Sequence, residues 1–158
     1  MHLKKQAMIA ELKSLYLANH RERYPSLPEP ARTAPRYTDK TANGLTKCII
    51  DYLRLQGCQA ERINSTGRYR DKTKTYTNVM GRTCSIGSGK WIPTSGQKGT
   101  ADISAVICGK AVKIEVKMKE KQSEAQKKYQ QQVEQAGGTY QIVRSFSEFF
   151  EFFTRLNI

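Results

Sequence analysis

Regular hydrophobic spacing is clearest between residues 43 and 57 of the chain. Apolar side chains there recur three and four positions apart, which is the spacing of one face of an α-helix. Gly57 follows the last of them and is expected to end the helix. The residues of this predicted apolar face are Leu45, Cys48, Ile49, Tyr52 and Leu53.

Alternation of apolar and polar residues predicts two neighbouring strands between residues 101 and 118. The first, 101–108, is a short apolar run. Gly109-Lys110 is predicted to form the hairpin turn before the second strand, 111–118. In the second strand one face is Val112, Ile114 and Val116, and the other is Lys113, Glu115 and Lys117.

The remaining segments complete an α/β fold in which a short mixed β-sheet is flanked by helices. Residues 65–98, which are rich in Gly, Ser, Thr and basic residues, predict loops with one hairpin. Trp91 and Ile92 are expected to anchor that hairpin to the core. The other predicted elements are a strand at 58–65, a polar helix at 123–136, a strand at 139–145 and a final helix after Ser145.

The first 40 residues predict an N-terminal helical arm rather than part of the compact domain. Residues 3–22 have helical composition, and residues 24–35 hold four of the chain's five prolines. Because proline fixes φ and removes a backbone donor, the second stretch predicts an extended connector. We therefore expect an arm at 1–40 and an α/β domain at 41–158.

Charge narrows the class of partner. The 158 residues include 27 Lys or Arg and 14 Asp or Glu, which gives a formal charge of +13. A small domain this basic repels itself when compact, and a polyanion such as DNA relieves the repulsion. From charge alone, a ribosome-associated or merely soluble basic protein is the alternative.

Neither a membrane segment nor a zinc site is expected. No apolar run approaches the ~20 residues that span a bilayer, and Glu11 and Lys13 make the start of the chain a poor signal peptide. The four cysteines form no CxxC pair, and both histidines lie far from them in the sequence. We expect a cytoplasmic protein with reduced, mostly buried thiols and no membrane partner.

Three side chains in the predicted strand pair carry the chemistry. Glu115 and Lys117 lie two residues apart on one strand and point the same way, roughly 6.5–7 Å apart along the backbone. A hairpin can bring Asp102 beside Glu115, and two carboxylates with the Val116 carbonyl suit a hard cation such as Mg²⁺. Lys117 beside that ion can orient a water and offset developing charge on a phosphate.

The ExK tripeptide is weak evidence by itself. An alternating Lys and Glu face is commonly a solvated surface with cross-strand ion pairs. The spacing also occurs at Glu11-Leu12-Lys13, in a helix-like stretch with no GxxD element upstream. The order of the surrounding elements therefore has to carry the interpretation.

Residues 98–117 read KGTADISAVICGKAVKIEVK, which is a KGxxD element ending at Asp102, an apolar strand, a short turn and an apolar ExK. This order resembles the core of the PD-(D/E)xK nuclease superfamily, and most of all its VRR-NUC branch. In that family a helical Gln lies near the active site, and Gln126 takes this position. Over residues 43–150 the resemblance implies a restriction-endonuclease-like fold, one or two Mg²⁺ or Mn²⁺ ions, and DNA cleavage that leaves a 5′-phosphate.

The resemblance is incomplete at the first helix, and Gln126 has a second possible role. The family often carries a Glu on the first helix that completes the metal site, whereas Asn43 or Thr46 stands there in this chain. Gln126 also has the spacing of a capping box with Ser123, a role that is compatible with a place in the active site.

Basic residues gather before the predicted site. Residues 61–98 hold eight Lys or Arg and two acidic residues, a net charge of +6. Interleaved Arg, Tyr and Asn suit phosphate contacts and base stacking, and a solvated loop is the alternative. The candidate nucleic-acid-binding residues are Arg62, Asn64, Arg68, Tyr69, Arg70 and Lys98, with Arg62 and Asn64 the best placed to reach the scissile phosphate.

The sequence thus predicts a Mg²⁺- or Mn²⁺-dependent endonuclease that hydrolyses DNA, structure-selective or nicking. Asp102 and Glu115 with the Val116 carbonyl would hold metal, Lys117 would serve the attacking water, and Gln126 would position it or the phosphate. One alternative is a catalytically weak or inactive nucleic-acid-binding module of the same fold. Another is a homodimer that resembles Holliday-junction resolvases.

Overall fold

The computed structural model describes residues 2–64, 67–94 and 96–156 and divides into two compact units. The first unit, which we call the sheet unit, contains residues 1–63 and 99–158. The second, the ribbon unit, contains residues 64–98. The division therefore does not fall near residue 40, where the sequence predicted the end of an arm.

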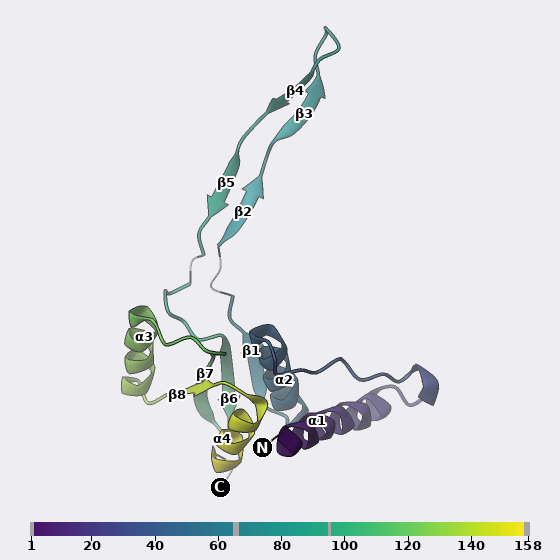
Figure 1. Cartoon of the computed structure of the whole chain (residues 1–158), viewed down its shortest axis with the longest axis vertical. Coiled ribbons are helices and arrows are strands. Elements are labelled where there is room, and N and C mark those ends of the chain that lie inside the picture. Colours follow the sequence, from purple (N-terminus) through teal and green to yellow (C-terminus); the bar gives the residue numbers. More distant parts are fainter. Residues whose placement is uncertain (1, 65–66, 95, 157–158) are drawn as a thin grey trace. The chain divides into compact units, whose positions relative to one another are not determined.

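A four-stranded mixed sheet organises the sheet unit (Figure 1). Its strand order is β1-β6-β7-β8, in which β6 is antiparallel to both β1 and β7, and β8 is parallel to β7. The predicted mixed α/β fold is confirmed. The strands are β1 (Gln59–Arg62), β6 (Ile103–Ile107), β7 (Lys110–Val116) and β8 (Thr139–Val143).

The turn between β6 and β7 lies one residue earlier than predicted. Ile107 pairs with Lys110, so Cys108 and Gly109 are the two central residues, with φ angles of 49° and 75°. A two-residue hairpin loop with positive φ at both positions is a type I′ turn, whose twist matches the strands. Gly109-Lys110 was the wrong pair because Cys108 adopts a conformation that its residue type does not signal.

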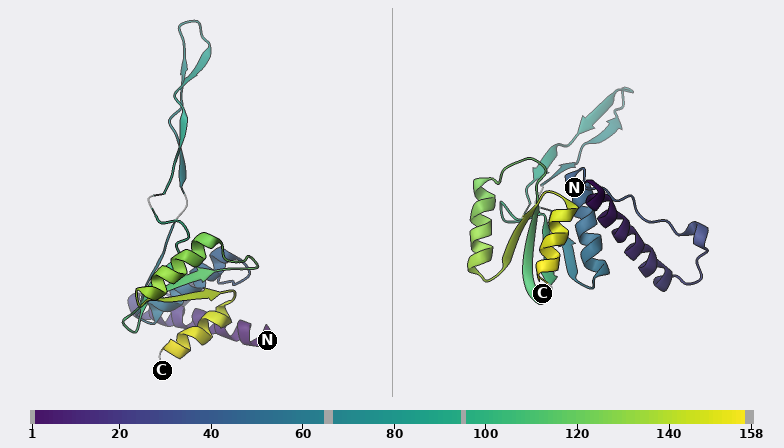
Figure 2. Two further views of the ribbon diagram at one scale, coloured as in Figure 1. Left: turned by 90° about the vertical axis from the view of Figure 1, so that its left-hand side faces the viewer. Right: turned by 60° about the horizontal axis from the view of Figure 1, so that its bottom comes forward.

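Helices cover both faces of this sheet (Figure 2). The apolar sides of α2 and α4 pack on one face, and α3 lies on the other and contacts β8. Thr41 caps α2 by accepting a hydrogen bond from the Gly44 amide, and Gly57 with φ 75° follows its end. The helices are α1 (His2–Arg23), α2 (Ala42–Leu55), α3 (Glu124–Gln135) and α4 (Phe146–Leu156), with a short 3-10 turn η1 (Glu29–Ala31).

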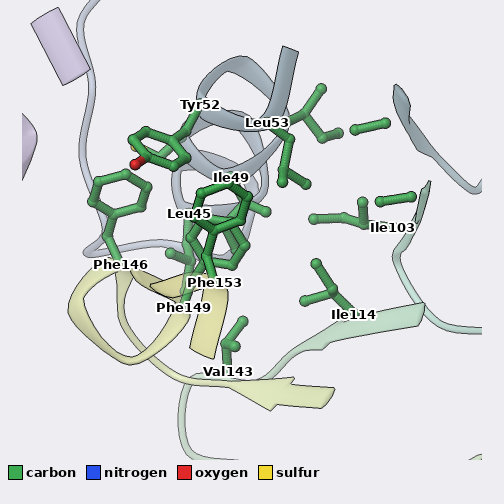
Figure 3. Close-up of a cluster of buried hydrophobic side chains, with 14 of the residues drawn as sticks. Leu45, Ile49, Tyr52, Leu53, Ile103, Ile114, Val143, Phe146, Phe149 and Phe153 are labelled. Atoms are coloured by element: carbon green, nitrogen blue, oxygen red, sulfur yellow. The ribbon is translucent and has the colours of Figure 1, made fainter. Parts of the chain in front are cut away.

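The core lies between the sheet and the α2/α4 pair (Figure 3). Tyr52 of α2 makes edge-on contacts with Phe146, Phe149 and Phe153 of α4, a geometry that aromatic pairs prefer. The other buried side chains labelled in the figure are Leu45, Ile49, Leu53, Ile103, Ile114 and Val143.

The N-terminal helix belongs to this core as well. Leu12 of α1 is fully buried in the same cluster, and α1 contacts both α2 and α4. The segment after it folds back around Arg32, whose guanidinium donates to the carbonyls of Tyr24 at 2.8 Å and Leu27 at 2.5 Å. The helix expected in an arm is therefore part of the sheet unit. None of the helices among the described residues is long and apolar enough to cross a membrane.

The ribbon unit consists of two short antiparallel strand pairs in succession. In the first, β2 (Arg68–Asp71) pairs with β5 (Gly89–Ile92), and in the second, β3 (Lys74–Thr77) pairs with β4 (Thr83–Ile86). The predicted hairpin is present, but Trp91, one of its two predicted anchor residues, is not buried. Trp91 is 56% exposed, because its indole lies over Gly67 instead of entering a core: a Cβ at Gly67 would lie 2.7 Å from the Trp91 Nε1 atom.

Candidate active site

Asp102 and Glu115 lie opposite each other on neighbouring strands. The register pairs Ile103 with Ile114, so the next position along brings residue 102 beside residue 115. The backbone amide of Val116 donates to Oδ2 of Asp102 at 2.9 Å, which holds this carboxylate at the end of β7. The geometry therefore brings together the two carboxylates that the sequence singled out.

Glu115 is a buried carboxylate with incomplete pairing. Its side chain is only 3% exposed, on the face of β7 away from α2 and α4. Lys117 Nζ lies 3.1 Å from Oε1, and the Gln126 side-chain amide donates to the same oxygen. Within the described part of the chain Oε2 is buried without a hydrogen-bond partner. Buried acceptors are rarely left in this condition, so the free oxygen marks a place where a further positive group would bind.

The electrostatics of the site agree with that geometry. Burial raises the pKa of the Glu115 carboxyl, and the negative charge of Asp102 raises it further, while the Lys117 ammonium acts in the opposite direction. Two anions side by side in a poorly hydrated place repel each other, and Lys117 neutralises only part of their charge. A cation between the two carboxylates would relieve the repulsion.

Gln126 fills both roles that its sequence position allowed. Its Oε1 accepts from the Ser123 backbone amide at 2.9 Å, and the Gln126 backbone amide donates to Ser123 Oγ at 3.3 Å, which is a complete capping box. The Nε2 end of the same side chain donates to Glu115. The first turn of α3 is thereby joined to the carboxylate in β7.

Gly99 shows why a glycine precedes Asp102. Its φ is +82°, and a Cβ at this position would collide with the backbone carbonyl of Ala125 in α3. The segment leading to Asp102 thus passes against the first turn of α3 at a distance that only glycine permits. Gly99 is part of the KGxxD element, but the sequence does not indicate that it packs against α3.

Tyr140 was not selected from the sequence. It lies on β8 opposite Lys113 of β7, is buried, and has a hydroxyl with no hydrogen-bond partner among the described residues. Burial and then the negative charge of Glu115 raise the pKa of its phenol to about 12. The sequence predicts only a strand around Tyr140. It does not indicate that this tyrosine lies close enough to Glu115 to be affected by its charge.

The donor set fits a hard divalent cation. Asp102, Glu115 and the Val116 carbonyl offer oxygen ligands only, which suits Mg²⁺ or Mn²⁺ with water completing the coordination. In residues 2–64, 67–94 and 96–156 no group of three His, Cys, Asp or Glu side chains is placed to hold a metal ion. The protein ligands would therefore be two carboxylates and a carbonyl, which places much of the coordination on water and substrate.

The first-helix positions do not supply a third charged ligand. Thr46 is buried, and its hydroxyl donates to the Ala42 carbonyl of its own helix at 2.8 Å. Asn43 Oδ1 accepts from Arg62 Nη2 at 2.7 Å. Arg62 pairs with Ile103, whose side chain faces the core, so it points to the α2 side of the sheet, whereas Glu115 points to the α3 side.

The other candidate nucleic-acid-binding residues belong to the ribbon unit. Arg68, Tyr69 and Arg70 form most of β2, and all three are exposed. Asn64 and Lys98 stand at the two ends of that unit and are also exposed. Of the six predicted contacts, only Arg62 lies in the sheet unit with the carboxylates.

The cysteines take no part in the site. Of the four, Cys48 alone is buried, while Cys58 and Cys84 are half-buried and Cys108 is exposed. The prediction that most of them are buried is therefore wrong.

The chain matches no protein-family model, no curated protein and no solved structure.

Proposed function

We propose that this chain is a metal-dependent endonuclease of the PD-(D/E)xK type that hydrolyses phosphodiester bonds in DNA. The observation that carries the proposal is the buried Glu115 carboxylate, which has one unpaired oxygen, Asp102 opposite it and Lys117 on its other oxygen. A purely structural Glu and Lys face would be solvated and paired. The order of the elements supports a restriction-endonuclease-like core. The β6/β7 hairpin is followed by the helix α3 and then by β8, which is parallel to β7.

Each residue of the site has a separate task. Asp102, Glu115 and the Val116 carbonyl would hold Mg²⁺ or Mn²⁺, and the bound ion would polarise the phosphate and acidify a water. Lys117 offsets negative charge that develops on the phosphate and orients the water that attacks it. Gln126 holds the Glu115 carboxylate in place through its side-chain amide.

A second candidate function has one observation in its favour. Because Asn43 and Thr46 are bonded elsewhere and carry no charge, the first helix adds no acidic ligand. A nucleic-acid-binding module that retains the fold but cleaves weakly or not at all would have this feature. Such a module binds DNA without a divalent ion, and its affinity falls steeply with salt.

A cleavage panel separates the two functions. Purified chain would be incubated with plasmid, linear, single-stranded, flapped and four-way DNA in Mg²⁺, Mn²⁺ or EDTA. We expect nicking or cutting only with metal, and a loss of at least about 100-fold in Asp102→Asn and Lys117→Met. Glu11→Gln and Lys13→Met are matched controls, since they alter the same tripeptide spacing in α1 and should cut normally. If Lys117→Met cuts like the wild type, or if no DNA is cut while binding persists in EDTA, the nuclease proposal is wrong.

A further inference from the structure

The ribbon unit exposes apolar and basic side chains without a core of its own. Among its described residues none is buried, and an isolated two-stranded ribbon is marginally stable in water. Contiguous exposed apolar surface in such an element commonly marks a binding site. Its exposed large apolar residues are Tyr69, Tyr76, Val79, Met80, Ile86 and Trp91.

Two of these aromatics have a role inside the ribbon. Tyr69 and Trp91 are cross-strand partners, and each ring lies over a glycine, Gly89 for Tyr69 and Gly67 for Trp91. An aromatic ring that covers a strand glycine in this way stabilises the pair. The contacts of these two rings with strand glycines therefore account for their position on the ribbon surface. No such contact accounts for the exposed apolar residues at the turn, Val79 and Met80.

Val79 and Met80 occupy the turn between β3 and β4. Val79 is as exposed as in an open chain, with 105% relative accessibility, and Met80 is 74% exposed. The turn beneath them is ordered by Asn78, whose Oδ1 accepts from the amides of Met80 at 3.0 Å and Arg82 at 2.9 Å. Two apolar side chains are thus held in solvent on a fixed backbone.

The charge of the ribbon selects a polyanionic partner. Residues 67–94 hold six basic residues and one acidic residue, Asp71. The Asp71 carboxylate accepts from the Thr73 amide at 2.8 Å, and hydrogen bonds to Thr73 lower its pKa, so it serves the backbone. One face of the β3/β4 pair carries only hydroxyl side chains, which can approach a phosphate closely: Thr75, Thr77, Thr83 and Ser85.

We propose that the ribbon binds duplex DNA and that Val79 and Met80 insert as an apolar wedge between base pairs. A two-stranded β-ribbon fits the groove of B-form DNA, while the major groove of A-form RNA is too deep and narrow. Apolar side chains that enter a base step unstack it, at a cost of a few kcal/mol per step. The cost is lowest where stacking is already interrupted, so the preferred substrate is DNA with a nick, mismatch or branch.

This inference deepens the proposed function by naming the class of DNA, and it rests on that function only in taking DNA as the partner. The test measures binding of the full chain in EDTA, where metal-dependent cleavage cannot occur. Fluorescence anisotropy would compare an intact duplex, the same duplex with one central nick, and an RNA duplex of the same sequence. A 2-aminopurine base opposite the nick reports unstacking.

The wild type should bind the nicked duplex about tenfold more tightly than the intact one and brighten the 2-aminopurine. The double variant Val79→Ser, Met80→Ser should lose both effects and retain the salt dependence. Ile86→Ser is the matched control, since Ile86 is 64% exposed on β4 but lies away from the turn. It should bind like the wild type.

Phosphate contacts are tested separately. Arg68→Gln with Arg70→Gln should weaken binding to both DNA duplexes equally and lower the slope of log affinity against log salt by about two. Equal binding of nicked and intact duplex by the wild type, equal binding of the RNA duplex, or no effect of the double Ser variant would each overturn the proposal. Cleavage lost in Asp102→Asn with this binding intact shows that the two proposals stand or fall independently.

Discussion

Gln126 joins the start of α3 to the Glu115 carboxylate of β7 with one side chain, because its carbonyl oxygen closes the helix cap and its amide donates to the carboxylate. The cap fixes where the amide is, and the amide fixes the rotamer of a buried acid. Helix formation and the geometry of the candidate site are therefore coupled through a single residue.

That coupling can be separated by substitution. Ser123→Ala removes the cap hydroxyl and should cost about 1 kcal/mol of unfolding free energy with cleavage largely retained. Gln126→Ala should cost a similar amount and also reduce cleavage, because Glu115 loses a hydrogen-bond donor. Urea denaturation and plasmid nicking measure the two effects. Equal nicking by both variants would mean that Gln126 acts only as a cap.

The raised pKa of Glu115 gives the stability a defined pH dependence. In the folded chain this carboxyl keeps its proton above the ordinary value of 4.5, so the folded state binds more protons than the unfolded state there. The contribution of Glu115 to stability is present below that value and is lost as pH rises through the folded pKa. In EDTA, Glu115→Gln should therefore raise Tm at pH 8 more than at pH 4.

The same measurement in metal supplies the control. Mg²⁺ should raise the Tm of the wild type at pH 8, because an ion that binds the folded state stabilises it. The Glu115→Gln variant should respond much less, and Glu11→Gln should behave like the wild type at each pH. A Tm difference between Glu115→Gln and the wild type that does not change with pH would contradict the assignment.

Two glycines with similar φ allow a matched test of the packing at Gly99. Gly109→Ala at φ 75° meets no atom within 4 Å, so it should cost only backbone strain, about 1–2 kcal/mol. Gly99→Ala adds a collision with the Ala125 carbonyl and should cost about 3 kcal/mol or more and displace α3. Urea unfolding compares the variants, and cleavage should fall in Gly99→Ala alone. Equal destabilisation by Gly99→Ala and Gly109→Ala would show that α3 can move away from residue 99 at little energetic cost.

Arg32 is expected to hold the N-terminal segment in place. Its side chain is 5% exposed, and it bonds several carbonyls beyond the end of α1. Arg32→Met should cost about 2–3 kcal/mol, because the carbonyls of Tyr24, Pro25 and Leu27 all lose the same charged donor. Arg21→Met removes an exposed ion pair with Glu29 and should destabilise the fold much less. Thermal unfolding distinguishes them, and similar Tm values would refute the role of Arg32.

The sequence predicted those parts of the fold that strong periodicity encodes. The helix α2, the strands β6 and β7 and the cap at Ser123 follow from spacing, since a single buried face repeats over several residues. The place of α1 did not follow: among its described side chains only Leu12 is fully buried, and the other apolar side chains that pack on the core, Met8, Ile9, Leu15 and Tyr16, are only partly buried. Trp91 was expected in a core because of its size, but the ribbon unit has no core.

For the candidate site, the sequence identified the residues but not their burial or their hydrogen-bond partners. The order of Asp102, Glu115 and Lys117 along two strands was enough to predict that they meet. Nothing in the order indicates that Glu115 Oε2 lies buried without a partner or that Tyr140 lies near it. Those properties depend on how the helix α3 and the strand β8 close over the carboxylates.

The hydrogen bond from the Ile63 amide to the Asp102 carbonyl, 2.8 Å long, has a consequence for how this chain can vary. It extends the β1/β6 ladder to Ile63, the last residue before the ribbon unit, so the sheet is paired up to the point where the chain leaves it. Loop closure depends only weakly on length, and insertions are tolerated best where the flanking ends already meet. The ribbon can therefore lengthen, shorten or be exchanged without rebuilding the sheet, and under the two proposals substrate preference can evolve separately from hydrolysis.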